Sequence, residues 1–296
     1  MRQLSRIFNL HHPYNKPRFE VTQRFGVNQR HPFSRALSGC WLFNEGAGET
    51  VVDLGPNKQD GTFTSAPTWA AGPYSNPVLD FNGTTDYVTI DSDGSEYVYI
   101  NTGRAHTISV ICRLDAFPDA TSYPVICELN CNGSDAYELF FSNNATYDDI
   151  SFGNDNDFVK ASVQHSAPTG TWMHIIFTYN GSGATTLSNF AVYIDGQSET
   201  TATTGVYSNA TNRTLIGSKP DGSDYYWNGP IEHLMIWERE FSALEAQLLY
   251  QDPYGMFRWD IDHSYIFAAA AAGRTTKNTD AFTLGVSSGI SFRMVT

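Results

Sequence analysis

The sequence contains no long apolar stretch. Among its 296 residues, no window approaches the run of about 18 apolar side chains that a membrane-spanning helix requires. The first 19 residues also lack the apolar core of roughly 7–15 residues that marks a secretion signal. We therefore expect neither membrane insertion nor export by the Sec pathway.

Cysteine and charged residues are scarce as well. Four cysteines in a chain of this length do not form a disulfide scaffold, and Cys127 and Cys131 would lie about 13 Å apart on a straight strand, too far to bridge. No glycine-rich phosphate loop, nucleophile elbow or zinc-ligand spacing occurs. Charged residues make up only 17% of the chain, which argues against long amphipathic helices.

The residues that are present favour β-strands. Aromatic residues, which fill strands, reach 14% of the chain, and 24 glycines supply tight turns. Alternation places Ile108, Val110, Cys112 and Leu114 on one face of a strand. About a dozen short runs of this kind, separated by NG, DG and SG pairs, predict an all-β fold, a two-sheet antiparallel sandwich.

One helix can be located by its first turn. Ser242 followed by Glu245 is a capping box, and Leu244, Leu248 and Leu249 form an apolar stripe behind it. The helix is expected to end by Pro253, because proline cannot continue it.

Charge divides the chain into three segments. Residues 1–37 carry seven basic side chains and one acidic one. Residues 38–257 carry seven basic and 27 acidic side chains, and residues 258–296 carry four basic and three acidic ones. This predicts a basic N-terminal arm, an acidic body and a short C-terminal tail. Prolines favour an extended path for the arm, and the charge asymmetry indicates that the arm has its own partner. The alternative is an arm that docks on its own acidic body.

Aromatic residues in the arm and tail are the candidate partner-binding anchors. In the tail, AFTLGV and ISFRMV alternate like two strands of a β-hairpin that joins a neighbouring subunit or, alternatively, the edge of its own sandwich. We expect protein partners and not nucleic acid, because the acidic body opposes approach to a polyphosphate. The candidate anchors are Phe8, Phe19, Phe25, Phe33, Phe282 and Phe292.

The body also resembles a known family. Five ordered segments carry the resemblance: GCWLFNEGAGETVVDLGPNKQDGTF, LDFNGTTDYVTI, HTISVICRLDAF, TWMHIIFTYNG with VYIDGQ, and NGPIEHLMIWEREFSALEAQLLY. They are similar to the laminin G-like domains of the concanavalin A-like lectin–glucanase superfamily, throughout residues 38–257. The resemblance implies a jelly-roll sandwich in which Trp41, Phe81, Tyr87, Trp172 and Trp237 hold core or strand positions.

The resemblance further implies a structural calcium ion as the one cofactor to consider. Relatives often hold Ca²⁺ with a carboxylate on the strand equivalent to GPIEH and with backbone carbonyls of an early loop. This nominates Glu232, with carbonyls near Asp53 or Gly55, as the metal site. Oxygen-rich loops at residues 91–96, 154–157 and 221–224 are alternatives, since Ca²⁺ prefers about six to eight oxygen ligands, although solvated turn acids explain them equally.

Catalysis is not expected. Glycoside hydrolysis uses two carboxylates about 5–10 Å apart, and β-glucanase relatives carry theirs on one strand as E-x-D-x-x-E. No such string occurs, and the nearest acids, Glu232, Glu238 and Glu240, are separated by LMIW and then by a turn. We therefore predict that the chain is not an enzyme.

Three consecutive aromatics form a candidate glycan site. Tyr225, Tyr226 and Trp227 follow an Asp-rich turn, and exposed aromatic rings stack on sugars. The alternative is that alternate members of this triplet pack into the core, as strand geometry demands of at least one.

These features together predict a virion structural protein. Members of the family include carbohydrate-binding modules, adhesion domains, glycosidases and many proteins of phage particles. A fold typical of extracellular surfaces, without a secretion signal and with flanking arms, fits a capsid decoration or auxiliary protein of a tailed phage. It would assemble in the host cytoplasm, bind the major capsid protein or neighbouring copies, and be exposed on the particle. The alternatives are a glycan-binding tail-fibre or receptor-binding lectin and a bacterial carbohydrate-binding module.

Overall fold

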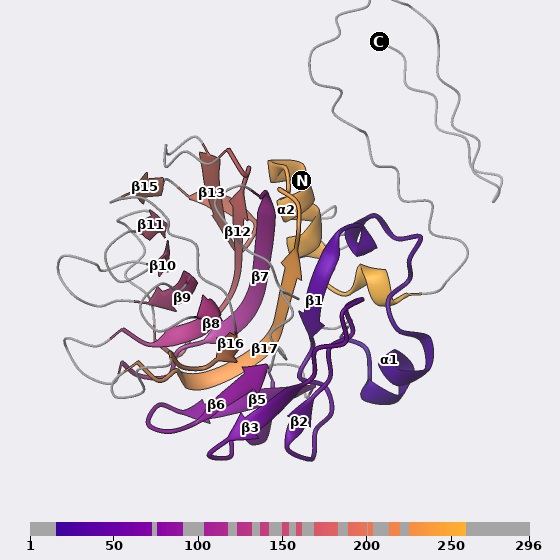
Figure 1. Cartoon of the computed structure of the whole chain (residues 1–296), viewed down its shortest axis with the longest axis vertical. Coiled ribbons are helices and arrows are strands. Elements are labelled where there is room, and N and C mark those ends of the chain that lie inside the picture. Colours follow the sequence, from indigo (N-terminus) through magenta and orange to yellow (C-terminus); the bar gives the residue numbers. More distant parts are fainter. Residues whose placement is uncertain are drawn as a thin grey trace, which may run out of the picture. The chain divides into compact units, whose positions relative to one another are not determined.

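The computed structural model of the chain describes most of the body and part of the N-terminal segment (Figure 1). Residues 1–259 form one compact unit and residues 260–296 a second. Residues 1–15 and 259–296 lie outside the described part. The described ranges are 16–72, 76–90, 104–117, 123–131, 137–141, 150–153, 158–161, 169–182, 189–199, 201–203, 213–219 and 225–258.

Two antiparallel sheets form a sandwich. The first, the eight-stranded sheet, has the order β14-β13-β12-β7-β17-β5-β4, and β1 also pairs with β17. Its strands are β1 (Leu37–Trp41), β4 (Thr68–Ala71), β5 (Pro77–Asn82), β7 (His106–Arg113), β12 (Trp172–Tyr179), β13 (Phe190–Ile194), β14 (Gln197–Glu199) and β17 (Asn228–Trp237).

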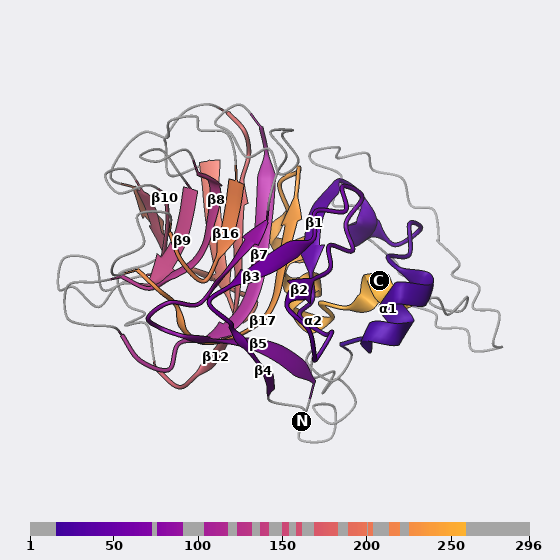
Figure 2. The same ribbon diagram turned by 60° about the horizontal axis from the view of Figure 1, so that its bottom comes forward.

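The second, the nine-stranded sheet, has the order β15-β11-β10-β9-β8-β16-β6-β3-β2 and packs face to face on the first (Figure 2). This architecture confirms the predicted jelly-roll sandwich. The strands are β2 (Thr50–Val51), β3 (Gly61–Thr64), β6 (Tyr87–Ile90), β8 (Val125–Cys131), β9 (Tyr137–Phe141), β10 (Ile150–Gly153), β11 (Phe158–Ala161), β15 (Thr201–Thr203) and β16 (Arg213–Ile216).

The main hydrophobic core lies between the two sheets. Alternation along β7 sends Ile108, Val110 and Cys112 into this core, as predicted, and Leu114 follows them. The other face of β7 contributes Ser109, which is buried on the outer side of the eight-stranded sheet. Both faces of β7 and β17 are therefore covered, which explains their nearly uninterrupted burial.

A second apolar cluster covers the outer face of the eight-stranded sheet. It is built from two segments that are distant in the sequence and lie on the same side of β17 in both views (Figures 1 and 2). The first segment holds α1 (Phe19–Phe25) and the 3-10 helix η2 (Pro32–Ser34); the second holds α2 (Ala243–Gln251) and the 3-10 helix η4 (Gly255–Phe257). We call residues 16–36 the N-terminal strap.

The extended arm predicted over residues 1–37 is wrong from Lys16 onward. The strap contains helical turns and docks on its own domain: the Asn28 amide donates to the Met256 carbonyl at 2.8 Å, and the Asn28 side-chain amide donates to the Arg258 carbonyl at 2.9 Å. Pro32 does not extend the chain, because it takes the first turn of η2, where its missing N–H costs nothing. The strap therefore belongs to the body, as in the alternative in which the arm docks on its own domain.

The predicted aromatic anchors have different locations. Phe33 is a core residue: it is buried and stacks on Phe241 at 5.3 Å between ring centroids, so it is not a partner contact. Phe19 begins α1 and is partly exposed, whereas Phe25 ends α1 with a side chain outside the described part. Phe8, Phe282 and Phe292 also lie outside the described residues and stay predictions.

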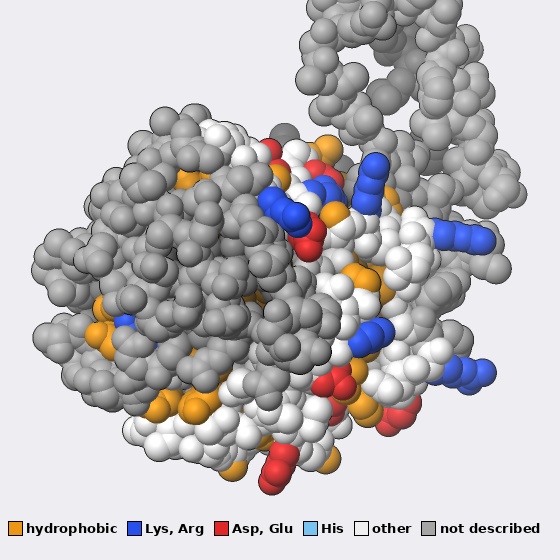
Figure 3. Space-filling model, viewed as in Figure 1, with side chains coloured by type: hydrophobic (Ala, Val, Ile, Leu, Met, Phe, Trp, Pro, Cys, Tyr) orange, Lys and Arg blue, Asp and Glu red, His pale blue; other side chains and the backbone are white. Residues whose placement is uncertain are grey.

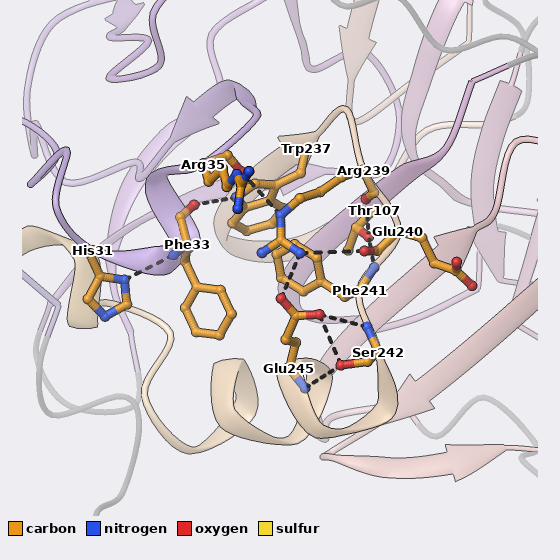
Figure 4. Close-up of polar contacts among 10 residues, drawn as sticks. All are labelled: His31, Phe33, Arg35, Thr107, Trp237, Arg239, Glu240, Phe241, Ser242 and Glu245. Atoms are coloured by element: carbon orange, nitrogen blue, oxygen red, sulfur yellow. Dashed lines mark hydrogen bonds and ion pairs between the residues drawn. The ribbon is translucent and has the colours of Figure 1, made fainter. Parts of the chain in front are cut away.

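The strap is fastened at the corner where β17 turns into α2 (Figure 4). The Trp237 indole N–H donates to the Phe33 carbonyl at 2.6 Å. The Arg239 guanidinium lies 4.1 Å over the Phe241 ring and pairs with Glu245 at 2.7 Å. Ser242 and Glu245 form the predicted capping box, so the sequence located the start of α2 correctly.

Two buried histidines are held in apolar surroundings. His106 lies against Tyr179, 5.2 Å between ring centroids, and its Nδ1 is 3.2 Å from the Arg104 carbonyl oxygen. Burial lowers the pKa of His106 to about 4. In His31, burial and then the charge of Arg258 lower the pKa to about 4 as well. Both rings are therefore neutral in the folded protein at neutral pH.

The contribution of these two histidines to the free energy of unfolding should therefore fall as the solution is acidified. Between pH 6.5 and 4 the unfolded chain binds protons at these histidines that the folded chain does not, so their contribution is complete above about pH 6.5 and is lost as pH falls. Replacing His106 by Gln should remove up to about 1.4 kcal/mol per pH unit from this slope. Urea denaturation at a series of pH values measures both slopes. Identical slopes for the parent and His106→Gln would contradict the assignment.

Candidate functional site

The three consecutive aromatics of the predicted glycan site occupy two environments. Trp227 is fully buried and meets Phe141 edge-on, with 5.1 Å between ring centroids. Its ring cannot stack on a sugar, so its inclusion in the glycan site was wrong. Tyr225 and Tyr226 are partly exposed, and they lie on the outer face of the nine-stranded sheet beside Phe140 and Tyr87 respectively.

Tyr225 forms an aromatic platform with two other rings. Its ring lies 4.5 Å from that of Tyr123, which in turn lies 4.8 Å from Phe140 on β9. The Val125 amide at the start of β8 donates to the Tyr225 carbonyl at 3.0 Å and so fixes the backbone of the platform. Tyr226 and Tyr87 make a second, looser pair at 6.5 Å. We use the term aromatic platform for Tyr123, Phe140 and Tyr225.

A buried ion pair lies directly against the platform. The Lys219 ammonium is 4.3 Å from the centre of the Tyr225 ring and 3.5 Å from a Glu138 carboxylate oxygen. Both charged side chains are only 4% exposed. Strand register places Glu128, also buried, opposite Glu138 on the neighbouring strand. The buried ion pair therefore holds the Tyr225 ring in place, and the partly exposed rings of Tyr123 and Tyr225 offer apolar faces at the surface.

The sequence reasoning missed Tyr123, Lys219 and Glu138. A signal for one of them was available: β9 places Leu139 and Phe141 in the core, so its alternate residue Glu138 must lie on the outer face. Lys219 follows β16, and its contact with Glu138 joins residues 81 positions apart. No local pattern predicts such a contact.

Asp53, nominated as a calcium ligand, has a different role. Its carboxylate accepts three backbone N–H groups, from Cys40 at 2.8 Å, Gly55 at 2.7 Å and Gln59 at 3.0 Å. Burial raises the pKa of this carboxyl, and the three hydrogen bonds oppose the rise. Asp53 thus holds the loop between β1 and β3 in place.

Glu232, the other nominated calcium ligand, lies on β17 with partners of its own. Its carboxylate accepts a hydrogen bond from the Tyr254 hydroxyl at 3.0 Å, and the charge of Lys16 lies nearby. The structure therefore does not join Glu232 and Asp53 in one metal site. Within the described ranges no three His, Cys, Asp or Glu side chains are grouped to hold a metal ion, and the three oxygen-rich loops lie outside those ranges.

Tyr254 is also the last member of a buried series of hydrogen-bonded side chains beneath α2. Its hydroxyl is 3.0 Å from His233 Nδ1, and the other ring nitrogen of His233 is 3.0 Å from the Ser109 hydroxyl, which also contacts His174 at 2.8 Å. Serine and histidine in contact suggest an activated nucleophile. Ser109 and both histidines are buried, however, so these hydrogen bonds connect β7, β12 and β17 to one another and do not face a substrate.

The family of the chain follows from its sequence. A family profile described as the concanavalin A-like lectin/glucanases superfamily matches residues 82–247, more than half of the chain. The chain belongs to this superfamily, as the five ordered segments had indicated. No curated protein matches the chain. The helices in the described residues are all too short or too polar to cross a membrane.

Solved structures share the fold at low sequence identity. Domain 4 of AbnA, a GH43 extracellular arabinanase from Geobacillus stearothermophilus solved in complex with arabinotriose, matches with a TM-score of 0.53 at 17% identity, covering 72% of this chain and 98% of that domain. The binding domain of Paraclostridial Mosquitocidal Protein 1 matches with a TM-score of 0.50 at 13% identity, covering 73% of this chain and 52% of the other. Trypanosoma rangeli sialidase gives 0.50 at 15% identity, covering 76% and 34%. The chain thus spans about half of the toxin domain and a third of the sialidase.

Proposed function

We propose that this domain binds glycans on the outer face of its nine-stranded sheet, at the aromatic platform, whose Tyr225 ring is held in place by the buried Lys219–Glu138 ion pair. The observation that carries the proposal is the contact of a buried ammonium with the Tyr225 ring, 4.3 Å from its centre, beside a buried carboxylate. Sugars combine apolar C–H faces, which stack on aromatic rings, with hydroxyls that require fixed hydrogen-bonding groups.

Two further observations support a binding role. Around β17 the outer face of the eight-stranded sheet is covered by the strap and α2, so this part of the sheet offers no binding surface. The arabinanase domain with the same fold was solved with arabinotriose, which makes short neutral oligosaccharides the first ligands to test. The proposal concerns binding and assigns no catalytic residue.

Replacing Tyr225 by Ala should weaken glycan binding about tenfold or more, because stacking on one ring contributes about 1–2 kcal/mol. Tyr250→Ala is the matched control, since Tyr250 is a partly exposed tyrosine on α2, beside His174 beneath the eight-stranded sheet. Calorimetric titration with oligosaccharides selected on a glycan array gives both affinities. Equal losses in the two variants, or no glycan bound by the parent, would refute the proposal.

For the whole chain we propose the role expected from the sequence, a structural protein on the surface of a tailed-phage particle, where the glycan site would face outward. Support comes from the charge of the strap. Its arginines are exposed, and Figure 3 shows several Lys and Arg side chains, with Asp and Glu side chains among them, over the region of α1 and β1. The net positive charge of the strap suits an acidic neighbouring protein of the particle. The exposed arginines are Arg18, Arg24, Arg30 and Arg35.

Changing these four arginines to Gln should prevent the chain from co-sedimenting with purified particles while leaving its melting temperature within a few degrees of the parent's, because exposed charges contribute little to folding. Lys58→Gln with Arg104→Gln is the control, because it removes exposed cations outside the strap. Quantitative mass spectrometry of gradient-purified particles provides the occupancy. Normal occupancy of the fourfold variant would exclude the strap as the docking surface.

A further inference from the structure

β17 changes its neighbour partway along its length. Residues 228–231 pair with β5, whereas residues 234–237 pair with β1. On its other side β17 pairs with β7, and there the register shifts between Ile231 and His233, which leaves Glu232 as an extra, bulged residue. On the side where β5 gives way to β1, Glu232 and His233 pair with neither strand, so the ladder is interrupted there.

The Lys16 ammonium lies in this gap. It donates to the Pro77 carbonyl at 2.5 Å, the Glu232 carbonyl at 2.9 Å and the Phe43 carbonyl at 3.3 Å. These carbonyls come from the start of β5, from β17 and from the loop after β1, and the lysine itself is only 6% exposed. An ammonium carries three N–H donors, so its hydrogen-bonding capacity is matched by the three carbonyls.

Two carboxylates add negative charge farther from the ammonium, and neither forms an ion pair with it. Glu232 is buried; one of its oxygens accepts the Tyr254 hydroxyl, and the other makes no hydrogen bond within the described residues. Glu45 accepts the Val52 amide at 2.7 Å through one oxygen, and its second oxygen also lacks a hydrogen bond there. Both side chains act on the Lys16 charge. Carbonyl oxygens that converge on one position, with carboxylates nearby, are the ligand types that calcium prefers.

We propose that this group of oxygens is a cation site that the chain fills with its own Lys16, which removes any need for a metal ion, and that Ca²⁺ can occupy the site once the ammonium is absent. The cation cradle consists of the carbonyl oxygens of Phe43, Pro77 and Glu232. The carboxylates of Glu45 and Glu232 would turn toward Ca²⁺ and supply its negative ligands. The ammonium of Lys16 thus takes the place of the calcium ion that was expected at Glu232. Because Lys16 belongs to the strap, its contacts also attach the strap to the sheet.

The titration of Lys16 agrees with this arrangement. Burial lowers the pKa of Lys16 to about 8, and the charges of Glu232 and Glu45 oppose that shift. At pH 7 the amine therefore stays mainly protonated. The charge of Lys16 in turn opposes the rise that burial causes in the pKa of Glu232.

The test compares the full-length parent with Lys16→Met, which keeps the aliphatic stem and removes the charge. The parent should melt at the same temperature in EDTA and in millimolar calcium. Lys16→Met should melt lower in EDTA and regain about 5 °C or more with calcium, with one Ca²⁺ bound per chain by calorimetry. Lys16→Met combined with Glu232→Gln should show no calcium response, and Lys58→Met, which removes an exposed lysine, should behave as the parent.

Two outcomes would overturn the proposal: a parent stabilised by calcium as strongly as Lys16→Met, or a Lys16→Met variant that binds no calcium. If this variant does not fold in EDTA, refolding in calcium, magnesium or EDTA replaces the melting experiment. Folding only with calcium supports the site, and equal failure in all three refutes it.

A measurement on the parent needs no variant. Reductive methylation under native conditions should label the exposed Lys58 quickly and leave Lys16 protected. Labelling of both amines at similar rates would show that Lys16 does not fill the cradle.

Discussion

Burial of both faces of β17 is the constraint on which this structure depends. Its inner face supplies Ile231, Leu234 and Ile236 to the core between the sheets. Its outer face carries Met235 and Trp237, large apolar side chains that would be exposed on a bare two-sheet sandwich. Burying each such side chain contributes roughly 1.5–3 kcal/mol, so a covering layer is strongly favoured. The strap and the segment from α2 to η4 provide that layer.

The same constraint determines where polar groups can be placed. The outer side of β17 is dry, so Glu232 and His233 require buried partners, and Tyr254 contacts both of them. Where β17 passes from pairing with β5 to pairing with β1, three backbone carbonyls converge on one point. The Lys16 ammonium is the cation that satisfies them. The outer face of the nine-stranded sheet presents partly exposed aromatic rings beside a buried charged pair.

Much of this fold could be predicted from the sequence. Alternation along β7, the capping box at Ser242 and the ordered family segments identified the sandwich and the start of α2, because each depends on residues close together in the chain. The path of the strap could not be predicted in this way. Its prolines are compatible with an extended segment, and the docked conformation is chosen by contacts such as Lys16 with Glu232, 216 positions apart. In the triplet from Tyr225 to Trp227, alternation required a buried ring but could not say which one.

Native-state hydrogen exchange followed by mass spectrometry tests the central claim, that the strap and β17 form one cooperative unit. The Asn28 and Gly26 amides are hydrogen-bonded in the strap, to Met256 and Thr22, and the ladder amides of β17 provide the internal reference. The account predicts that peptides covering residues 19–36 and 228–237 exchange with the same free energy of opening, and that both respond equally to low concentrations of denaturant. Rapid exchange of residues 19–36 while β17 stays protected would contradict it.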